Sequence, residues 1–316
     1  MQNTIDRLLN TAVHKLQHQA VRDLAWCCFS APIMHKLPDS EATILPFTNQ
    51  HLWPWLYALD QQPEPLLTHI AQVKSTRLGI YYETLWRFYF SHQSEWELLQ
   101  HNLQVERNGA TLGAFDFLCR RGNKYWHIET AVKFYLCDTR NEQDAHHWHH
   151  WIGPSSQDRL DLKLAHLCHH QLPLHQTAEA KTQLQKLYPQ ADDWNTGLCL
   201  QGYLFSPASM DYRPAFSHED QGRGHWWYLQ DFLDYLLEEH ERGWVIVEHQ
   251  RWLSPIHTKN CDELMCNKDL AQQLPRQIGE IKRPLLLAAM EEINVEGNYW
   301  REDWRGFIVP DTWPVN

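Results

Sequence analysis

The sequence predicts an α/β fold in which helices flank a mixed sheet, and three observations predict it. Apolar residues recur at helical spacing over residues 77–92. Residues 102–136 alternate like strands and are interrupted by two short glycine-containing turns. A second amphipathic helix follows Gly153, and an apolar strand occupies residues 198–205. The expected order is therefore helix, three strands, helix, strand, or αβββαβ.

The first 75 residues predict a helical N-terminal cover on this core. An apolar stripe at helical spacing begins at Leu8, Leu9, Val13 and Leu16 and continues into residues 21–25. Prolines at 32, 38 and 46 then indicate loops before a further helical piece at residues 53–56. No pattern typical of a catalytic site stands out in this segment.

The core begins with the helix at 77–92. Its stripe of Leu78, Tyr82, Leu85 and Tyr89 predicts one buried face. Glu83 lies beside this face. One interpretation pairs it with Arg87, since residues four apart are neighbours on a helix.

Three strands follow as a meander, at residues 102–107, 112–119 and 125–136. Asn108-Gly109 and Gly122-Asn123 are typical of two-residue hairpin turns, because these residues tolerate positive φ. If Gly122-Asn123 is the loop, Arg121 pairs with Lys124, and counting outward places Asp116 opposite Glu129.

Two opposed carboxylates repel each other, so a positive group is expected between Asp116 and Glu129. Lys133 shares the face of Glu129, four residues along the strand. A divalent cation, Mg²⁺ or Mn²⁺, is the other candidate, because hard cations prefer oxygen ligands. Such a constellation suits phosphodiester hydrolysis, in which the metal acidifies a water and lysine neutralises developing charge.

These residues resemble the core motif of the PD-(D/E)XK, or restriction-endonuclease-like, nuclease superfamily. Gly113-Ala114-Phe115-Asp116 is similar to its Gly-x-x-Asp strand, and Glu129 with Lys133 is similar to its Glu-x-Lys strand. The spacing departs from that pattern, since Ala131 stands where the lysine is expected. The resemblance implies an αβββαβ core, Asp116 and Glu129 as metal ligands, and Glu83 as a third acid on the first core helix.

Most of the chain also resembles an uncharacterised bacterial family of unknown function that lies near these nucleases. That resemblance implies no substrate, and it is carried by the runs at 20–26, 102–105, 131–136 and 151–154.

The helix after Gly153 is expected to begin with Ser155 as its N-cap. Arg159 and Lys163 recur on one face of this helix, together with His166 and His170. That face is either a solvated charged surface, with Asp161 nearby, or a surface that grips phosphates beside the acids.

Residues 138–150 are polar and predict a loop rich in histidine: His146, His147, His149 and His150. Such a tract can bind Zn²⁺ or Cu²⁺. A solvated loop is the alternative, because no cysteine or carboxylate nearby completes a tetrahedral set. Eight cysteines are scattered without a C-x-x-C pair, which favours buried reduced thiols over disulfides.

Residues 207–316 are expected to form an α+β extension, with a soft boundary near 206 to the core at 76–206. Helices are expected at 226–239 and around 285–293, with a short strand at 244–248 between them. The last twenty residues, rich in tryptophan and proline, are expected to wrap the surface.

The overall composition limits which partners, nucleic acid or membrane, the protein is expected to bind. A net charge of −11 with histidines neutral argues against a strong nonspecific nucleic-acid binder, although a local basic groove is compatible with it. No apolar run is long enough to span a membrane and the N-terminus lacks a signal-peptide plan, so a cytoplasmic location is expected. The sequence thus favours a Mg²⁺-dependent nuclease acting on DNA or RNA. The alternative is a catalytically inactive binding or structural protein with the same fold.

Overall fold

The computed structural model describes residue 13 and residues 15–45, 51–293 and 299–314. Within these residues eleven strands join in one mixed sheet, with the path β2-β3-β4-β6-β7-β11-β10-β8 and three short strands attached at its sides. The strands are β1 (Thr43–Ile44), β2 (Glu97–Arg107), β3 (Ala110–Arg121), β4 (Lys124–Cys137), β5 (Trp151–Ile152), β6 (Trp194–Pro207), β7 (Gly222–Tyr228), β8 (Gly243–Val247), β9 (His257–Thr258), β10 (Leu285–Ile293) and β11 (Tyr299–Val309). The α-helices of the described residues are α2 (Gln19–Phe29), α3 (Leu52–Gln61), α4 (Glu64–Ala71), α5 (Leu78–His92), α6 (Glu142–Ala145), α7 (Leu160–His166), α8 (Ala178–Leu187), α9 (Leu229–Glu238) and α10 (Asn267–Ile281).

The predicted meander is confirmed. Asn108 and Gly109 adopt φ of 51° and 79°, so both central residues of the first turn are left-handed. In the second turn only Gly122 has positive φ, at 60°, which suits a turn with glycine in its first central position. Arg121 pairs with Lys124, as the turn predicts, and the antiparallel register runs on to Phe117 opposite Ile128.

The fourth core strand is also confirmed, and it is longer than expected. β6 pairs with β4 in parallel from Tyr125–Trp194 to Leu136–Phe205. A parallel pair requires a crossover, and α7 and α8 supply it. The described chain therefore contains the expected order as α5, β2, β3, β4, α7 and β6, with α6, β5 and α8 as additions that the sequence did not reveal.

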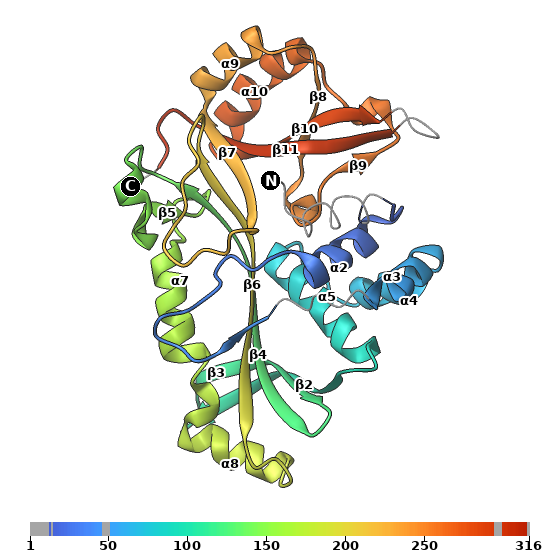
Figure 1. Cartoon of the computed structure of the whole chain (residues 1–316), viewed down its shortest axis with the longest axis vertical. Coiled ribbons are helices and arrows are strands. Elements are labelled where there is room, and N and C mark those ends of the chain that lie inside the picture. The colour runs from blue at the N-terminus through green and yellow to red at the C-terminus, as the bar shows by residue number, and fades with distance from the viewer. Residues whose placement is uncertain (1–12, 14, 46–50, 294–298, 315–316) are drawn as a thin grey trace.

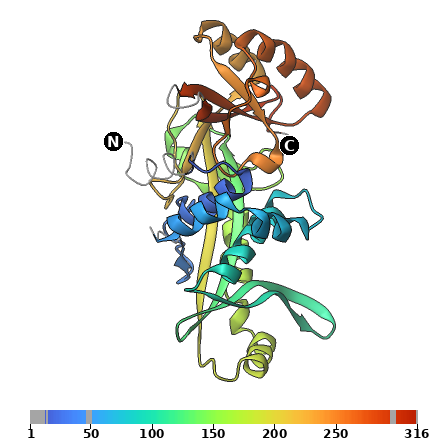
Figure 2. The same cartoon turned by 90° about the vertical axis from the view of Figure 1, so that its right-hand side faces the viewer.

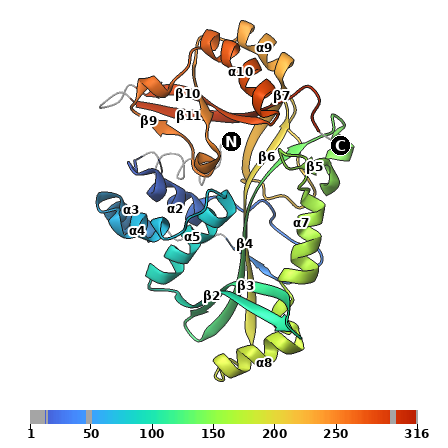
Figure 3. The same ribbon diagram turned by 180° about the vertical axis from the view of Figure 1, so that it is seen from behind.

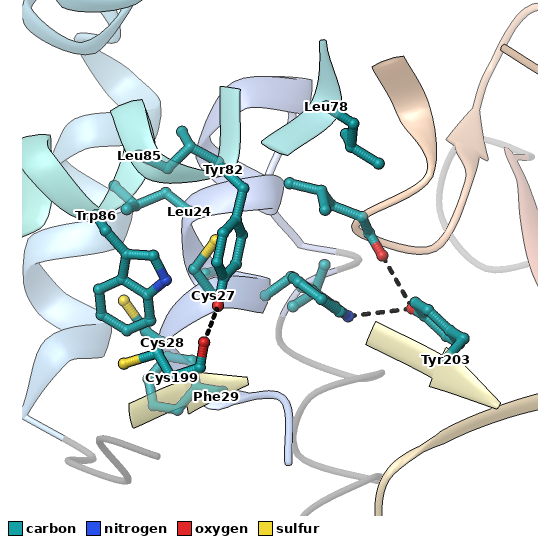
Figure 4. Close-up of a cluster of buried hydrophobic side chains, with 14 of the residues drawn as sticks. Leu24, Cys27, Cys28, Phe29, Leu78, Tyr82, Leu85, Trp86, Cys199 and Tyr203 are labelled. Atoms are coloured by element: carbon teal, nitrogen blue, oxygen red, sulfur yellow. Dashed lines mark hydrogen bonds between the residues drawn. The ribbon is translucent and has the colours of Figure 1, made fainter. Parts of the chain in front are cut away.

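Helices cover both faces of the central strands. α2 and α5 lie on one side of β4 and β6, and α7 lies on the other (Figures 1 and 3). A view turned by 90° shows β6 running between the C-terminal strands at the top and α8 at the bottom (Figure 2). On the α2 and α5 side, the Tyr82 hydroxyl donates to the Gln201 Oε1 atom at 2.6 Å. It also lies 3.4 Å from the carbonyl oxygen of Cys199, amid leucine, tryptophan and cysteine side chains (Figure 4).

The two central strands approach unusually closely where Gly202 faces Lys133. Gly202 has φ of 144°, and a Cβ atom there would lie 1.7 Å from the carbonyl oxygen of Lys133. Only glycine fits such an approach. This glycine therefore sets how closely β6 packs against the middle of β4.

The expected elements of the C-terminal extension need three corrections. Residues 226–228 belong to a strand, β7, and the helix begins only at Leu229. Residues 285–293, expected to be helical, form strand β10, because both of its neighbours, β8 and β11, pair with it and bury it. The last twenty residues contribute β11, an interior strand, rather than a surface wrap. The strand expected at 244–248 is confirmed as β8.

Two further expectations fail near the centre of the chain. Residues 138–150 are not all loop: Asn141 accepts hydrogen bonds from the backbone N–H groups of Gln143 and Asp144 and so caps the short helix α6. Ser155 does not cap α7, which begins at Leu160, because the Gly153 N–H donates to the Asp158 carbonyl at 2.7 Å and closes a turn first.

The N-terminal cover contains the expected helices, as α2, α3 and α4, and between α2 and α3 it contributes strand β1, which pairs with β6 in parallel. Val13 and Leu16 are buried as predicted, whereas Leu8, Leu9 and Pro46 lie outside the described residues. All eight cysteines are free, and five of them are buried. Among the described residues, no helix has both the length and the apolar character that a membrane span requires.

The sheet continues across the expected boundary near residue 206, because β7 pairs with β6 in parallel.

A buried ion pair lies near this junction. Arg305 donates to Glu302 at 2.5 Å and to the carbonyl oxygen of Ser254 at 3.0 Å, and its guanidinium lies 4.3 Å from the Tyr203 ring centroid. These contacts tie β11 to β6 of the core.

Candidate functional site

The candidate site lies where β3 and β4 separate. Their ladder ends at the pair Phe117–Ile128. Beyond it β3 remains paired with β2, while β4 continues beside β6. Asp116 and Glu129 are the next residues on the two strands, so both acids stand at the point of divergence.

The side chains of both acids replace the missing ladder hydrogen bonds. The Asp116 Oδ2 atom accepts from the backbone N–H of Thr130 at 2.8 Å and from its hydroxyl at 3.3 Å. In return, the Glu129 Oε1 atom accepts from the Asp116 backbone N–H at 3.4 Å. Each carboxylate thus contacts the opposite strand, and the two acids are held beside each other as the turn register predicts.

Glu129 is fully buried and is held by two further side chains. The His127 Nε2 atom lies 2.6 Å from Oε1, and both residues have no exposed surface. Burial lowers the pKa of His127 to about 3, so its ring is neutral and donates this hydrogen bond. The Gln171 amide donates to Oε2 at 2.6 Å. The orientation of the Glu129 carboxylate is therefore fixed from both sides.

The site raises the pKa of both acids. The pKa of Asp116 rises to about 8, first because of burial and then because of the Glu129 charge, while the Thr130 N–H opposes the rise. Burial likewise raises the pKa of Glu129 to about 7, against the hydrogen bond from Asp116 and the charge of Lys163. The protein alone therefore leaves negative charge at this point incompletely stabilised.

Glu83 approaches the same site from α5. It does not pair with Arg87, which instead donates to His69 at 3.0 Å. Its carboxylate lies 2.7 Å from His101 on β2. The charge of Glu83 contributes to the raised pKa of both Asp116 and Glu129, which places this third acid within electrostatic reach of the pair.

The position of Lys133 differs from the prediction. The Lys133 ammonium donates to Asp158, whose other oxygen lies 3.3 Å from the Tyr135 hydroxyl. Lys133 is therefore engaged with a carboxylate of the 153–158 turn and does not lie between the two acids.

The two basic residues near the start of α7 also differ from each other. Arg159, the residue before α7, pairs with Asp161 in its first turn, as expected for a solvated charged surface. Lys163 is half-buried and donates to the Gln171 Oε1 atom at 2.8 Å. Sequence spacing alone had grouped these two residues together.

The arrangement fits one class of metal better than others. The described residues contain no group of three or more His, Cys, Asp or Glu side chains placed to hold an ion. A closed structural zinc site is built from four such ligands, so this donor set does not fit one. Mg²⁺ is held by one or two carboxylates together with waters and substrate phosphates, and Asp116 with Glu129 matches that donor set.

The histidine-rich segment lies on a different part of the chain. His150 contacts Asp138 at 2.7 Å, and the rings of His147 and His149 stack 5.6 Å apart. These contacts involve the segment's own neighbours, and nothing in them selects a metal.

Sequence reasoning missed three side chains of the site. His127 shares the strand parity of Glu129, which could have singled it out. Asp158 pairs with Lys133 from a turn 25 residues along the chain, a contact that no local pattern indicates. Gln171 carried no signal at all, because its role depends on a contact with a residue 42 positions away.

The sequence model of a family described as Domain of unknown function (DUF1853) matches residues 22–309, and the chain belongs to that family. No curated protein and no solved structure matches the chain.

Proposed function

We propose that this DUF1853 protein is a nuclease that uses Mg²⁺, or Mn²⁺, to hydrolyse phosphodiester bonds in DNA or RNA. The observation that carries the proposal is the Asp116–Glu129 pair at the divergence of β3 and β4. Two adjacent carboxylates with raised pKa values are costly to ionise unless a cation compensates them.

The proposal assigns α5, β2, β3, β4, α7 and β6 to a restriction-endonuclease-like core. Support comes from the order of these elements and from the place of the acids within them. In this core Glu83 on α5 is the auxiliary acid, and Asp116 and Glu129 hold the metal. Free cysteines throughout the chain suit action in the reducing cytoplasm.

The reaction is a hydrolysis without a redox change. A water oxygen forms a new bond to phosphorus, the bond from phosphorus to the leaving oxygen breaks, and the water's proton ends on that leaving oxygen. When bound, the cation would polarise the phosphoryl oxygen and lower the pKa of the attacking water. The chain itself orients Glu129 through His127 and Gln171, and a lysine beside these acids would stabilise the charge that develops on the phosphate.

Cleavage of labelled single- and double-stranded DNA and RNA, with Mg²⁺ or Mn²⁺, tests the proposal. We expect Asp116→Asn and Glu129→Gln to lose activity by at least about 100-fold, as removal of a key charge-stabilising group does. Glu97→Gln is the matched control, because Glu97 is an exposed carboxylate on β2 that pairs with Arg120. A wild-type chain that cuts none of these substrates would rule the proposal out.

One observation favours a second candidate, a protein with the same fold that binds nucleic acid without cutting it. Glu129 has no exposed surface and accepts hydrogen bonds on both oxygens. The protein itself therefore supplies part of the stabilisation that a metal ion would give to this carboxylate. Binding of labelled DNA or RNA that persists without turnover in either metal would support this candidate.

A further inference from the structure

We propose that Lys163 on α7, and not Lys133 on β4, is the catalytic lysine that contacts the substrate phosphate beside the acid pair. This inference rests on the proposed nuclease function, and it identifies which lysine of that same site contacts the substrate. It departs from the sequence, in which the strand lysine stands closest to the expected motif.

Lys133 is the less suitable of the two because its charge already has a partner. Its ammonium is hydrogen-bonded to Asp158, a residue of the turn that precedes α7. The same turn is closed by the Gly153 N–H and the Asp158 carbonyl. A substrate phosphate would have to compete with this carboxylate for Lys133, whose position is explained by tying β4 to the turn.

Lys163 reaches the acid pair through one intervening side chain. Its Nζ atom donates to Gln171 Oε1 at 2.8 Å, and the Gln171 amide donates to Glu129 Oε2 at 2.6 Å. No carboxylate within the described residues forms an ion pair with Lys163. Its remaining ammonium protons are therefore available to an anion brought in by a ligand.

The local fold explains why these residues meet. The helix α7 ends at His166 and continues as a π-helical segment at Leu167–Gln171. A π-helical turn contains more residues than an α-helical turn, so the segment rotates Gln171 relative to a continuous α-helix. Gln171 thereby lies on the side of Lys163 that faces β4. Irregular turns of this kind often occur at functional sites.

The electrostatics agree with this placement. Burial lowers the pKa of Lys163 and the charge of Lys133 lowers it further, while the charges of Glu129 and Asp116 raise it. Lys163 in turn opposes the rise in the pKa of Glu129. Lys163 is thus the lysine whose charge is coupled to the acid pair.

The test compares Lys163→Met with Lys133→Met in Mn²⁺-dependent cleavage of the substrate that the wild type cuts best. Methionine keeps much of the apolar stem and removes the charge. We expect Lys163→Met to lower kcat on the order of 100- to 1,000-fold, as loss of one transition-state donor does, with KM changed only a few-fold. Lys133→Met should keep kcat within about tenfold. Thermal unfolding of both variants controls for misfolding.

A second variant separates chemistry from structure. Lys163→Ala should regain activity when methylammonium or ethylammonium is added, because a free amine can occupy the vacated position. A merely structural lysine would show no such rescue. If Lys163→Met cuts like the wild type, or if only Lys133→Met is inactive, Lys163 is not the catalytic lysine although the nuclease function stands. If the wild type itself cuts nothing, both proposals fail together.

Discussion

A change of pH from 8 to 6 should weaken Mn²⁺ binding to this protein far more than ordinary carboxylates would allow. Aspartate and glutamate normally titrate near pH 4, so between pH 6 and 8 they stay ionised and their metal affinity is flat. Asp116 and Glu129 differ, because burial raises the pKa of both, to about 8 and about 7, and the charge of Glu129 raises that of Asp116 further. The metal must displace protons from both groups over this range.

The magnitude follows from the two pKa values. At pH 6 about one Asp116 carboxyl in 100 is ionised, and about one Glu129 carboxyl in ten. Together these fractions weaken binding on the order of 1,000-fold relative to the ionised pair, whereas at pH 8 the loss is only about twofold. Because the two acids interact, their protons are not lost independently, and the expected change is a range. Between pH 8 and pH 6 we expect the Kd for Mn²⁺ to rise by about 100- to 1,000-fold, or about 3–4 kcal/mol.

Isothermal titration calorimetry with Mn²⁺ at pH 6, 7 and 8 measures this change directly. Repeating each titration in buffers of different ionisation enthalpy counts the protons released. Glu129→Gln should abolish the pH-dependent site, whereas Glu97→Gln should leave it intact. A wild-type Kd that differs by less than about threefold between pH 6 and 8 would refute the reasoning, because it would mean that the acids are already ionised at pH 6.

Two further predictions concern the framework that holds the site. Arg305→Met leaves the buried Glu302 carboxylate without its positive partner. Urea titration should show a free energy of unfolding lower by about 3–5 kcal/mol. Adding Glu302→Gln to this variant should restore part of the lost stability, because it removes the unpaired buried charge. Gly202→Ala forces a Cβ atom into the Lys133 carbonyl and should separate β4 from β6, so a variant that melts at the wild-type temperature would contradict the close approach of these strands.

Local chemistry accounts for the parts of the fold that were predicted correctly. Asn108-Gly109 and Gly122-Asn123 specify tight turns, and a tight turn sets the strand register within a few residues. That register predicts Asp116 next to Glu129, one position beyond the last ladder pair. The helix at 77–92 likewise has a clear apolar stripe, and α5 matches it.

The errors fall where the environment overrides local pattern. The apolar run at 285–293 suits either a buried strand or a buried helix, and pairing with β8 and β11 decides for the strand. In the same way, the sequence places Lys133 four residues from Glu129, yet it contains no sign that Asp158 would engage it.

The sequence by itself determined that Asp116 and Glu129 lie side by side, because a single tight turn connects their strands and such a turn sets the strand register over short range. Only the tertiary structure decided which lysine is connected to that pair and which side chains orient it. Gln171 reaches Glu129 from 42 residues away through the π-helical end of α7, and contacts of that range arise from how elements pack rather than from residue spacing.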